Sequence, residues 1–266
     1  MTSPALRNRA RKLAAQQGAA SPQFDHTRAN AYELQLMQLA EHRRTLKGIQ
    51  SIERKIDAKR TMLPVYKPWI DGLLAADSGG QDDVLVTVTL WHLDTGDLAG
   101  ALPMADYVIR HGLSTPDQYE RTAPTLIAEE VAETAIKLQD AGNGPDLFLL
   151  ISYLRLLHES DIFDQVRAKL HKAVGRACYA EGFKEQAAEH YRRALELHDK
   201  VGLKKDLEVL DREIKKQKAA ELPAASDVST ASVTAPASDE TSHEPEQEQE
   251  QEQTTEQQAP ATGEGS

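Results

Sequence analysis

Residues 81–112 read QDDVLVTVTLWHLDTGDLAGALPMADYVIRHG, and this stretch decides between a sheet and a helical fold. Its valines and threonines favour a strand, yet the first and third valines and Trp91 also recur at helical spacing. The residues that follow settle the choice, because the turn DTG at 94–96 is typical of a helix end and precedes a second helix-forming stretch, 97–112. The segment therefore predicts two helices joined by a short turn.

A similar unit recurs at residues 175–200, GRACYAEGFKEQAAEHYRRALELHDK. Its small and aromatic residues resemble the tetratricopeptide pattern, in which small side chains let two helices pack closely. Further helices are expected near 126–140 and 147–158, and a highly charged, peripheral one near 205–219. We therefore predict an all-α protein whose main domain, residues 62–219, is built from tetratricopeptide-like helical hairpins.

One long basic helix, residues 28–61, is expected before this domain. Its apolar residues recur at threes, fours and sevens; they are Leu39, Leu46, Ile49, Ile52 and Ile56. Pro64 and Pro68 are expected to end the helix, because proline suits an entry turn better than a helix interior. The narrow stripe is typical of a seam between two copies of a chain, although packing on the chain's own domain would give the same pattern.

The two ends of the chain carry opposite charge. Residues 1–27 are polar and alanine-rich, and we expect a flexible basic arm. Residues 220–266 form a Glu/Gln-rich tail that holds eleven acids and no Lys or Arg, so we expect it to be disordered. The remainder is balanced at 31 charges of each sign, but residues 1–70 hold thirteen basic and five acidic side chains. This asymmetry indicates a surface for a polyanion.

Several classes of function lack their signatures. The sequence shows no Walker A loop, paired-histidine zinc motif or nucleophile elbow, and no cofactor is evident. Its one cysteine, Cys178, excludes an internal disulfide, and no apolar run approaches the roughly 18 residues of a membrane span. We therefore expect a soluble, unsecreted protein that makes no contact with a membrane.

Four aspartates surround the apolar run, Asp82 and Asp83 before it and Asp94 and Asp97 after it. Three of them stand where helices are expected to begin, so we favour capping, in which a carboxylate accepts free amide protons. Asp94 lies about 16 to 18 Å from the first pair along a helix, which keeps both pairs from one ion. A Mg²⁺ site would instead join Asp94 and Asp97 to acids of another helix, the candidates being Glu129, Glu130 and Glu133.

The stronger functional signal is basic. Cations spaced along an arm and a helix can neutralise successive phosphates of double-stranded DNA. A merely solvated helix face usually mixes charges of both signs, whereas residues 1–70 have a net charge of +8 from thirteen basic and five acidic side chains. The candidate DNA-binding residues are Arg7, Arg9, Arg11, Lys12, Arg43, Arg44, Lys47, Arg54, Lys55, Lys59 and Arg60.

Six segments together resemble the small terminase subunit of cos-packaging temperate myophages of the peduovirus type. They are MTSPALR (1–7), TLKGIQS (45–51), LPVYKPWIDGLL (63–74), GGQDDVLVTVTLWHLDTGDLAGAL (79–102), RTAPTLIAEEVAE (121–133) and VRAKLHKAVGR (166–176). The resemblance spans about residues 1–215. It implies DNA binding, action with a large ATPase subunit in cutting cos DNA and packaging it into proheads, and residence in the host cytoplasm. It supplies no catalytic residues.

Three hypotheses remain open from the sequence. In the first, the chain recognises packaging-site DNA, self-associates and recruits the large subunit. In the second, it is itself the metal-dependent cos endonuclease, with Asp94 and Asp97 as ligands of Mg²⁺. In the third, it is a helical adaptor that makes no direct contact with DNA.

Overall fold

The computed structural model describes residues 5, 8–12, 26–117 and 119–221, and every regular element in them is an α-helix. The predicted all-α class is therefore confirmed. The main helices are α2 (His26–Gly48), α3 (Ile52–Ala76), α4 (Asp83–Asp94), α5 (Leu98–Arg110), α6 (Ala123–Asp140), α7 (Leu147–Leu156), α8 (Asp164–Ala180), α9 (Lys184–Leu197) and α10 (Lys204–Glu221). Residues 8–12 are also helical. Most of the predicted arm, and the predicted tail from residue 222 onward, lie outside the described residues.

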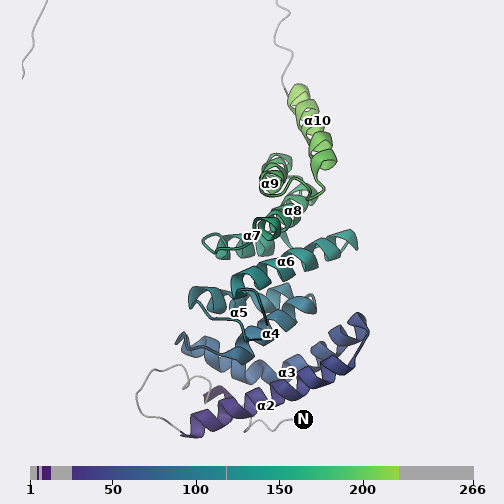
Figure 1. The fold of residues 1–266 in the computed structure, drawn as a ribbon. Helices are drawn as coiled ribbons and strands as arrows, with labels where there is room; N and C mark the ends of the chain where they lie inside the picture. Colours follow the sequence, from purple (N-terminus) through teal and green to yellow (C-terminus); the bar gives the residue numbers. More distant parts are fainter. Residues whose placement is uncertain (1–4, 6–7, 13–25, 118, 222–266) are drawn as a thin grey trace, which may run out of the picture. The chain divides into compact units, whose positions relative to one another are not determined.

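The helices follow one another in layers, from α2 to α10 (Figure 1). Helix α3 packs on α4, α4 on α5 and α6, α6 on α8, and α8 on α9, so contacts run mainly between neighbouring layers. The described residues as far as 221 group as one compact unit. Stacked helical hairpins of this kind bury one continuous core by layer-to-layer contact.

The α8–α9 hairpin shows why the tetratricopeptide-like pattern needs small residues. Gly175 of α8 lies against the ring of Tyr191 in α9, and a Cβ placed on Gly175 would be 2.6 Å from that ring. Gly182 forms the turn between the helices with φ of +83°, a conformation that favours glycine. The predicted hairpin at residues 175–200 is thus confirmed.

The ambiguous stretch at residues 84–93 is a helix, α4, that is buried on almost every side. It contacts α2, α3, α5 and α6, and Val84, Val86, Val88 and Trp91 are all buried. A helix enclosed in this way needs apolar residues around its whole circumference, which gives it the composition of a strand. Its two threonines bond back to backbone carbonyls one turn earlier, at 2.8 Å, so no hydroxyl is left unpaired.

The prediction of one long helix over residues 28–61 is wrong. Helix α2 ends at Gly48, and α3 begins at Ile52. Ser51 is the N-cap of α3, since its side chain accepts a hydrogen bond from the backbone N–H of Arg54. Pro64 and Pro68 do not end a helix but lie inside α3. Proline costs roughly 3 kcal/mol in a helix interior, and burial of Tyr66 and Trp69 nearby offsets that cost. The expected domain border at residue 61 therefore falls within a helix.

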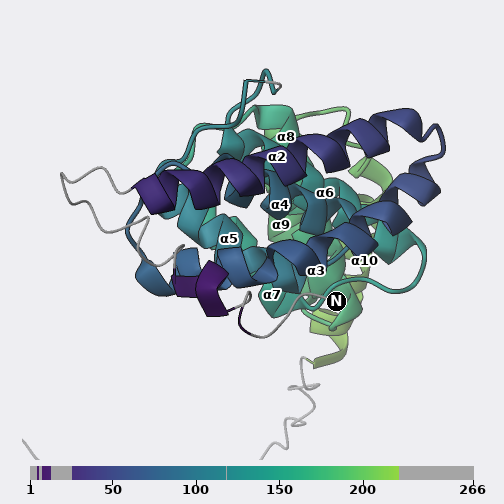
Figure 2. The same ribbon diagram turned by 90° about the horizontal axis from the view of Figure 1, so that it is seen from below.

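The apolar stripe of this segment is divided between the two helices. Leu39 and Leu46 are buried within the chain's own core, Ile49 packs on that core, and Ile52 is 73% exposed. Leu39 and Leu46 therefore pack on the chain's own domain and are not available to a second copy of the chain. Seen from below, α2 and α3 run side by side across the end layer and meet at the turn around residues 49–51 (Figure 2).

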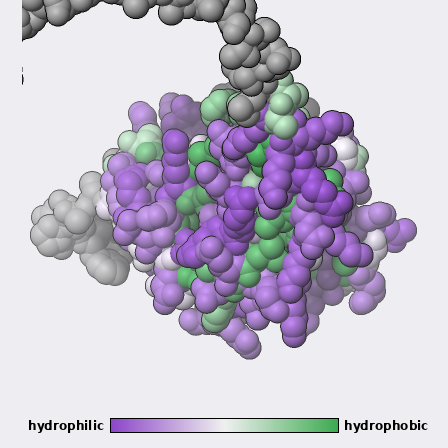
Figure 3. Space-filling model, turned by 90° about the horizontal axis from the view of Figure 1, so that it is seen from above, coloured by the Kyte–Doolittle hydropathy of each residue, from purple (hydrophilic) through white to green (hydrophobic). Residues whose placement is uncertain are grey.

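The face on the α10 side of the protein is largely hydrophilic (Figure 3). Viewed from the α10 side, hydrophobic residues appear as a narrow band between charged and polar ones (Figure 3). Among the described helices, none combines the length and the apolar character that crossing a membrane requires.

Candidate functional site

Asp82 caps α4 and is buried. Its carboxylate accepts hydrogen bonds from the backbone N–H of Leu85 at 2.7 Å and from the indole N–H of Trp69 at 3.0 Å. Burial raises the pKa of Asp82 to about 6, although these two donors favour the charged form. The neighbouring backbone N–H of Asp83 donates to the hydroxyl of Tyr32. The predicted capping role of Asp82 is confirmed. The hydrogen bonds around this cap connect α4 with Trp69 of α3 and Tyr32 of α2.

Asp97 caps α5. Its carboxylate accepts a hydrogen bond from the backbone N–H of Gly100 at 2.9 Å and lies 2.8 Å from the Nδ1 of His92. A Cβ on Gly100 would meet this carboxylate at 2.2 Å, so a side chain at position 100 would push the carboxylate out of its capping position. Asp94 ends α4, and Gly96 turns the chain with φ of +84°. The predicted turn and the second cap are therefore both present.

Asp94 and Asp97 face different groups. Asp94 forms an ion pair with Lys59 of α3, whereas Asp97 pairs with His92. Asp94 does approach one predicted acid of α6: burial, and next the charge of Asp94, raise the pKa of Glu130 to about 7. The other two acids have basic partners, since Glu129 pairs with Arg121 and Glu133 with Lys169.

These residues do not fit a two-metal site. A lysine ammonium already neutralises Asp94, and the second carboxylate is engaged in a helix cap. In the described part of the chain, no three His, Cys, Asp or Glu side chains gather in a way that could hold a metal ion. The Mg²⁺ site predicted at Asp94 and Asp97 therefore remains a prediction.

The eleven predicted DNA-binding cations fall into three groups. Arg7 lies outside the described residues. Five use their side chains within the described structure; they are Arg11 (with Asp71), Arg43 (with Thr87), Arg44 (with Glu41), Lys59 (with Asp94) and Arg60 (with Asp57 and the carbonyl of Thr95). The side chains of the other five pair with no described residue; they are Arg9, Lys12, Lys47, Arg54 and Lys55.

Three of the unpaired cations gather at one turn. Lys47 lies in the last turn of α2, and Arg54 and Lys55 lie in the first turn of α3, on the two sides of the connection. Lys47 and Arg54 are exposed and Lys55 is half-buried. We call Lys47, Arg54 and Lys55 the basic turn. The predicted single helix would have spread these cations along one rod, whereas the break at Gly48 brings them together.

Arg43 shows a signal in the sequence that the prediction missed. It is four residues from Leu39 and three from Leu46, so its spacing places it within the apolar stripe and not on the basic face. In the structure its guanidinium donates to the hydroxyl of Thr87 at 2.7 Å in a partly buried position. Lys59 carries the same signal, because it lies three residues after Ile56 and four before Leu63, but its partner Asp94 is 35 residues away.

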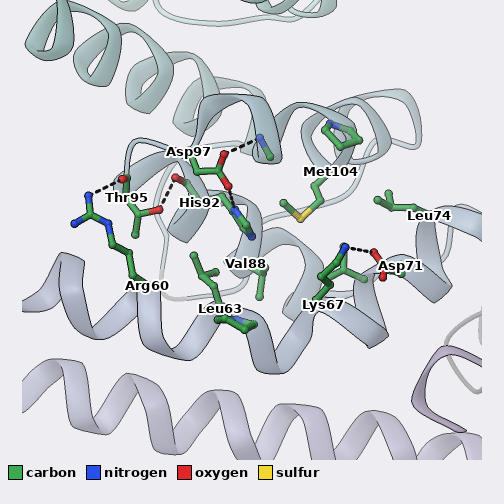
Figure 4. A pocket seen from close by; sticks show the side chains of 14 residues that line it. Arg60, Leu63, Lys67, Asp71, Leu74, Val88, His92, Thr95, Asp97 and Met104 are labelled. Carbon is green, nitrogen blue, oxygen red and sulfur yellow. Dashed lines mark hydrogen bonds and ion pairs between the residues drawn. The ribbon is translucent and has the colours of Figure 1, made fainter. Parts of the chain in front are cut away.

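A groove lies beside the aspartate cluster, between α3 on one side and α4 and α5 on the other (Figure 4). Its volume is about 630 Å³. Leu63, Val88 and Met104 contribute to its floor, while Arg60 and Lys67 line its α3 side. The His92–Asp97 pair stands at the opposite side, from which the turn at Thr95 accepts a hydrogen bond from Arg60.

Comparison with known proteins identifies close relatives. A family model described as "Phage small terminase subunit" matches residues 36–165. The chain is 45% identical over 217 residues to "Terminase, endonuclease subunit" of Escherichia phage P2, covering 81% of this chain and 87% of that protein. It is 23% identical over 144 residues to "Probable terminase, endonuclease subunit" of Haemophilus phage HP1 (strain HP1c1), covering 54% and 51% of the two chains. No solved structure gives a significant match.

Proposed function

Because this chain belongs to the phage small terminase subunit family, we propose that it is the DNA-recognition subunit of a packaging terminase. It contacts double-stranded cos DNA in the host cytoplasm and recruits the large ATPase subunit, which drives packaging into proheads. The observation that carries the DNA contact is the basic turn, where Lys47, Arg54 and Lys55 gather without a described acidic partner.

The chemistry of the basic turn suits the phosphate backbone. Exposed cations without a partner keep their charge available, and each phosphate that they neutralise releases counterions from the duplex. The cations that the structure pairs with Asp94, Glu41 or Thr87 are less available for this role. Contacts of this kind position a protein on the duplex but do not read its sequence.

The salt dependence of DNA binding tests this contact. We compare the wild type with the triple variant Lys47→Ala, Arg54→Ala, Lys55→Ala, using fluorescence anisotropy of labelled cos DNA at several salt concentrations. Losing three phosphate contacts should flatten the slope of log K against log salt by roughly 3. The matched control is Lys204→Ala, Lys205→Ala, Lys215→Ala, which removes three exposed cations of α10. An unchanged slope in the first variant would contradict the proposed contact.

We assign DNA cleavage to the partner subunit and not to Asp94 and Asp97. The support is that these two carboxylates are engaged by Lys59 and by the cap of α5. Purified chain with Mg²⁺ and cos DNA should then produce no nicks without the large subunit. Nicking by the chain alone that disappears in both Asp94→Asn and Asp97→Asn would instead support the metal-dependent endonuclease.

We further propose that the chain self-associates through the outer face of α2. Leu34 and Met37 lie one turn apart on that face and are 64% and 68% exposed. Large apolar side chains exposed together are typical of an interaction surface. Sedimentation analysis should show an oligomer in the wild type and a smaller species in Leu34→Glu, Met37→Glu. An identical mass for both proteins would exclude this face.

A further inference from the structure

The groove in Figure 4 lies next to another hollow in the protein surface. A second hollow of about 750 Å³ is lined by α5, α7 and the end of α3. Leu74 and Pro103 line both hollows, so the two join along the side of α3 and α5. We call the joined hollows the α3–α5 groove. It runs from Arg60 near one end to Arg155 near the other.

The floor of the α3–α5 groove is the edge of the hydrophobic core. Leu63, Ile70, Val88 and Met104 line it while remaining more than nine-tenths buried, and Pro103 lies between the two hollows. A duplex of DNA would meet this floor poorly, because its phosphates and sugar edges gain nothing from apolar contact. The accessible apolar lining is supplied by Leu74, Leu102, Pro103 and Leu156, and an apolar stripe of another protein would bury that surface favourably.

The rim of the groove carries slightly more positive than negative charge, with Arg60, Lys67, Arg110 and Arg155 against Asp71, Asp97 and Asp106. Its carboxylates, Asp71, Asp97 and Asp106, each already have a basic partner. On α3, Arg60 and Lys67 are 59% and 73% exposed and are seven residues apart, which places them two helical turns, about 10.5 Å, from each other. Arg155, at the far end, makes no side-chain pair with any described residue.

The ion pairs that hold Arg60 and Lys67 can be exchanged. Arg60 pairs with Asp57 and Lys67 with Asp71 along the same helix, and exposed pairs of this kind contribute little to stability. Arg11 of the N-terminal helical stretch also reaches Asp71, at 3.7 Å, and can neutralise it when Lys67 leaves. Both cations are therefore available to a partner that brings its own carboxylates.

We infer that the α3–α5 groove binds an amphipathic helix of the large terminase subunit, one that carries two acidic residues seven positions apart beside an apolar stripe. The apolar stripe, with anchors at i, i+3, i+4 and i+7, lies on the floor, and the two carboxylates pair with Arg60 and Lys67. This inference rests on the proposed function, because it assigns a place to the recruitment of the large subunit. It does not involve the basic turn.

The experiment measures binding without DNA. Overlapping fluorescein-labelled peptides of 20 residues that span the large subunit are titrated with the full chain. One peptide with the stated pattern should bind the wild type, and binding should weaken at least tenfold in Arg60→Glu, Lys67→Glu. Exchanging that peptide's two acids for lysine should restore binding to the double variant. The matched control is Lys204→Glu, Lys205→Glu, and thermal melts check that each variant is folded.

Three results would overturn the inference. Equal affinity of the wild type and the double variant would exclude the groove while leaving recruitment intact. Absence of binding by every peptide and by the whole large subunit would contradict recruitment of the large subunit as well. The proposed DNA contact would be unaffected, because the salt-dependence experiment tests it independently. Equal weakening of peptide binding in the control Lys204→Glu, Lys205→Glu would show that the net charge of the chain, and not the groove, determines the binding.

Discussion

Lys59 of α3 forms an ion pair with Asp94 of α4, and burial, followed by the charge of this same Asp94, raises the pKa of Glu130 in α6. The positive charge of Lys59 in α3 therefore lies close to two acids, Asp94 of α4 and Glu130 of α6, and reduces the repulsion between them. The lysine side chain is only 16% exposed, so its charge is weakly screened by water. A residue predicted to contact DNA thus forms an ion pair within the protein's own fold.

Replacing Lys59 should therefore destabilise the fold. Lys59→Ala leaves Asp94 and Glu130 facing each other without a cation, and loss of one partner from a partly buried pair costs on the order of 1–3 kcal/mol. Urea unfolding followed by circular dichroism measures the change. Lys55→Ala, on the same helix but without a described partner, should change stability by less than about 0.5 kcal/mol. Equal effects of the two variants would contradict the structural role of Lys59.

Glu130 should make the protein more stable as pH falls through neutrality. Its pKa in the folded state, about 7, lies above its ordinary value of 4.5, so the folded state binds a proton more readily than the unfolded chain. Stability should increase from pH 8 to about pH 5, and Glu130→Gln should remove much of this increase. The variant should also be more stable than the wild type at pH 8. Parallel stability curves for both proteins would contradict this assignment.

The pair His171 and His190 should act in the opposite direction. Their Nδ1 atoms lie 3.0 Å apart across the α8–α9 hairpin, and burial lowers the pKa of both, that of His171 to about 4 with further contributions from His190, Arg193 and Arg167. Because the folded state resists protonation, stability should be lost as pH falls below about 6.5. The double variant His171→Leu, His190→Leu should lose less stability between pH 6.5 and 4 than the wild type does. Comparison with Glu130→Gln separates the two effects.

Gly175 should tolerate no side chain. A Cβ would lie 2.6 Å from the ring of Tyr191, so Gly175→Ala should force α8 and α9 apart at a cost of about 1–3 kcal/mol. The control is Gly48→Ala at the end of α2, where no heavy atom lies within 4 Å of an added Cβ. Thermal unfolding of both variants measures the difference. A loss as small as that of the control would show that the helices are not packed on Gly175.

Local chemistry allowed much of this fold to be predicted from the sequence. The caps at Asp82 and Asp97, the turn at Gly96 and the α8–α9 hairpin each depend on residues within a few positions of one another. The composition of α4 is typical of a strand, but the turn and the helix-forming stretch that follow it allowed a helix to be predicted. These features are determined by short-range hydrogen bonds and by helical periodicity, which a sequence displays directly.

The errors arose where long-range packing outweighs local preference. Pro64 and Pro68 predict the end of a helix, but burial of Tyr66 and Trp69 carries α3 through both of them. The ion pair of Lys59 could not be predicted either, because its partner Asp94 lies 35 residues away in the sequence. The basic turn exists because α2 ends at Gly48, and the sequence did not predict that end.

The central claim, that the turn between α2 and α3 contacts DNA, is tested most directly by site-specific crosslinking. A photo-crosslinking amino acid is placed at Gln50, which is exposed within the turn, and separately at Lys204 at the start of α10. Irradiation with labelled cos DNA should give a strong crosslink from position 50, and this crosslink should weaken as salt is raised. The account is contradicted if position 50 gives no crosslink while DNA is bound, or if position 204 crosslinks equally well.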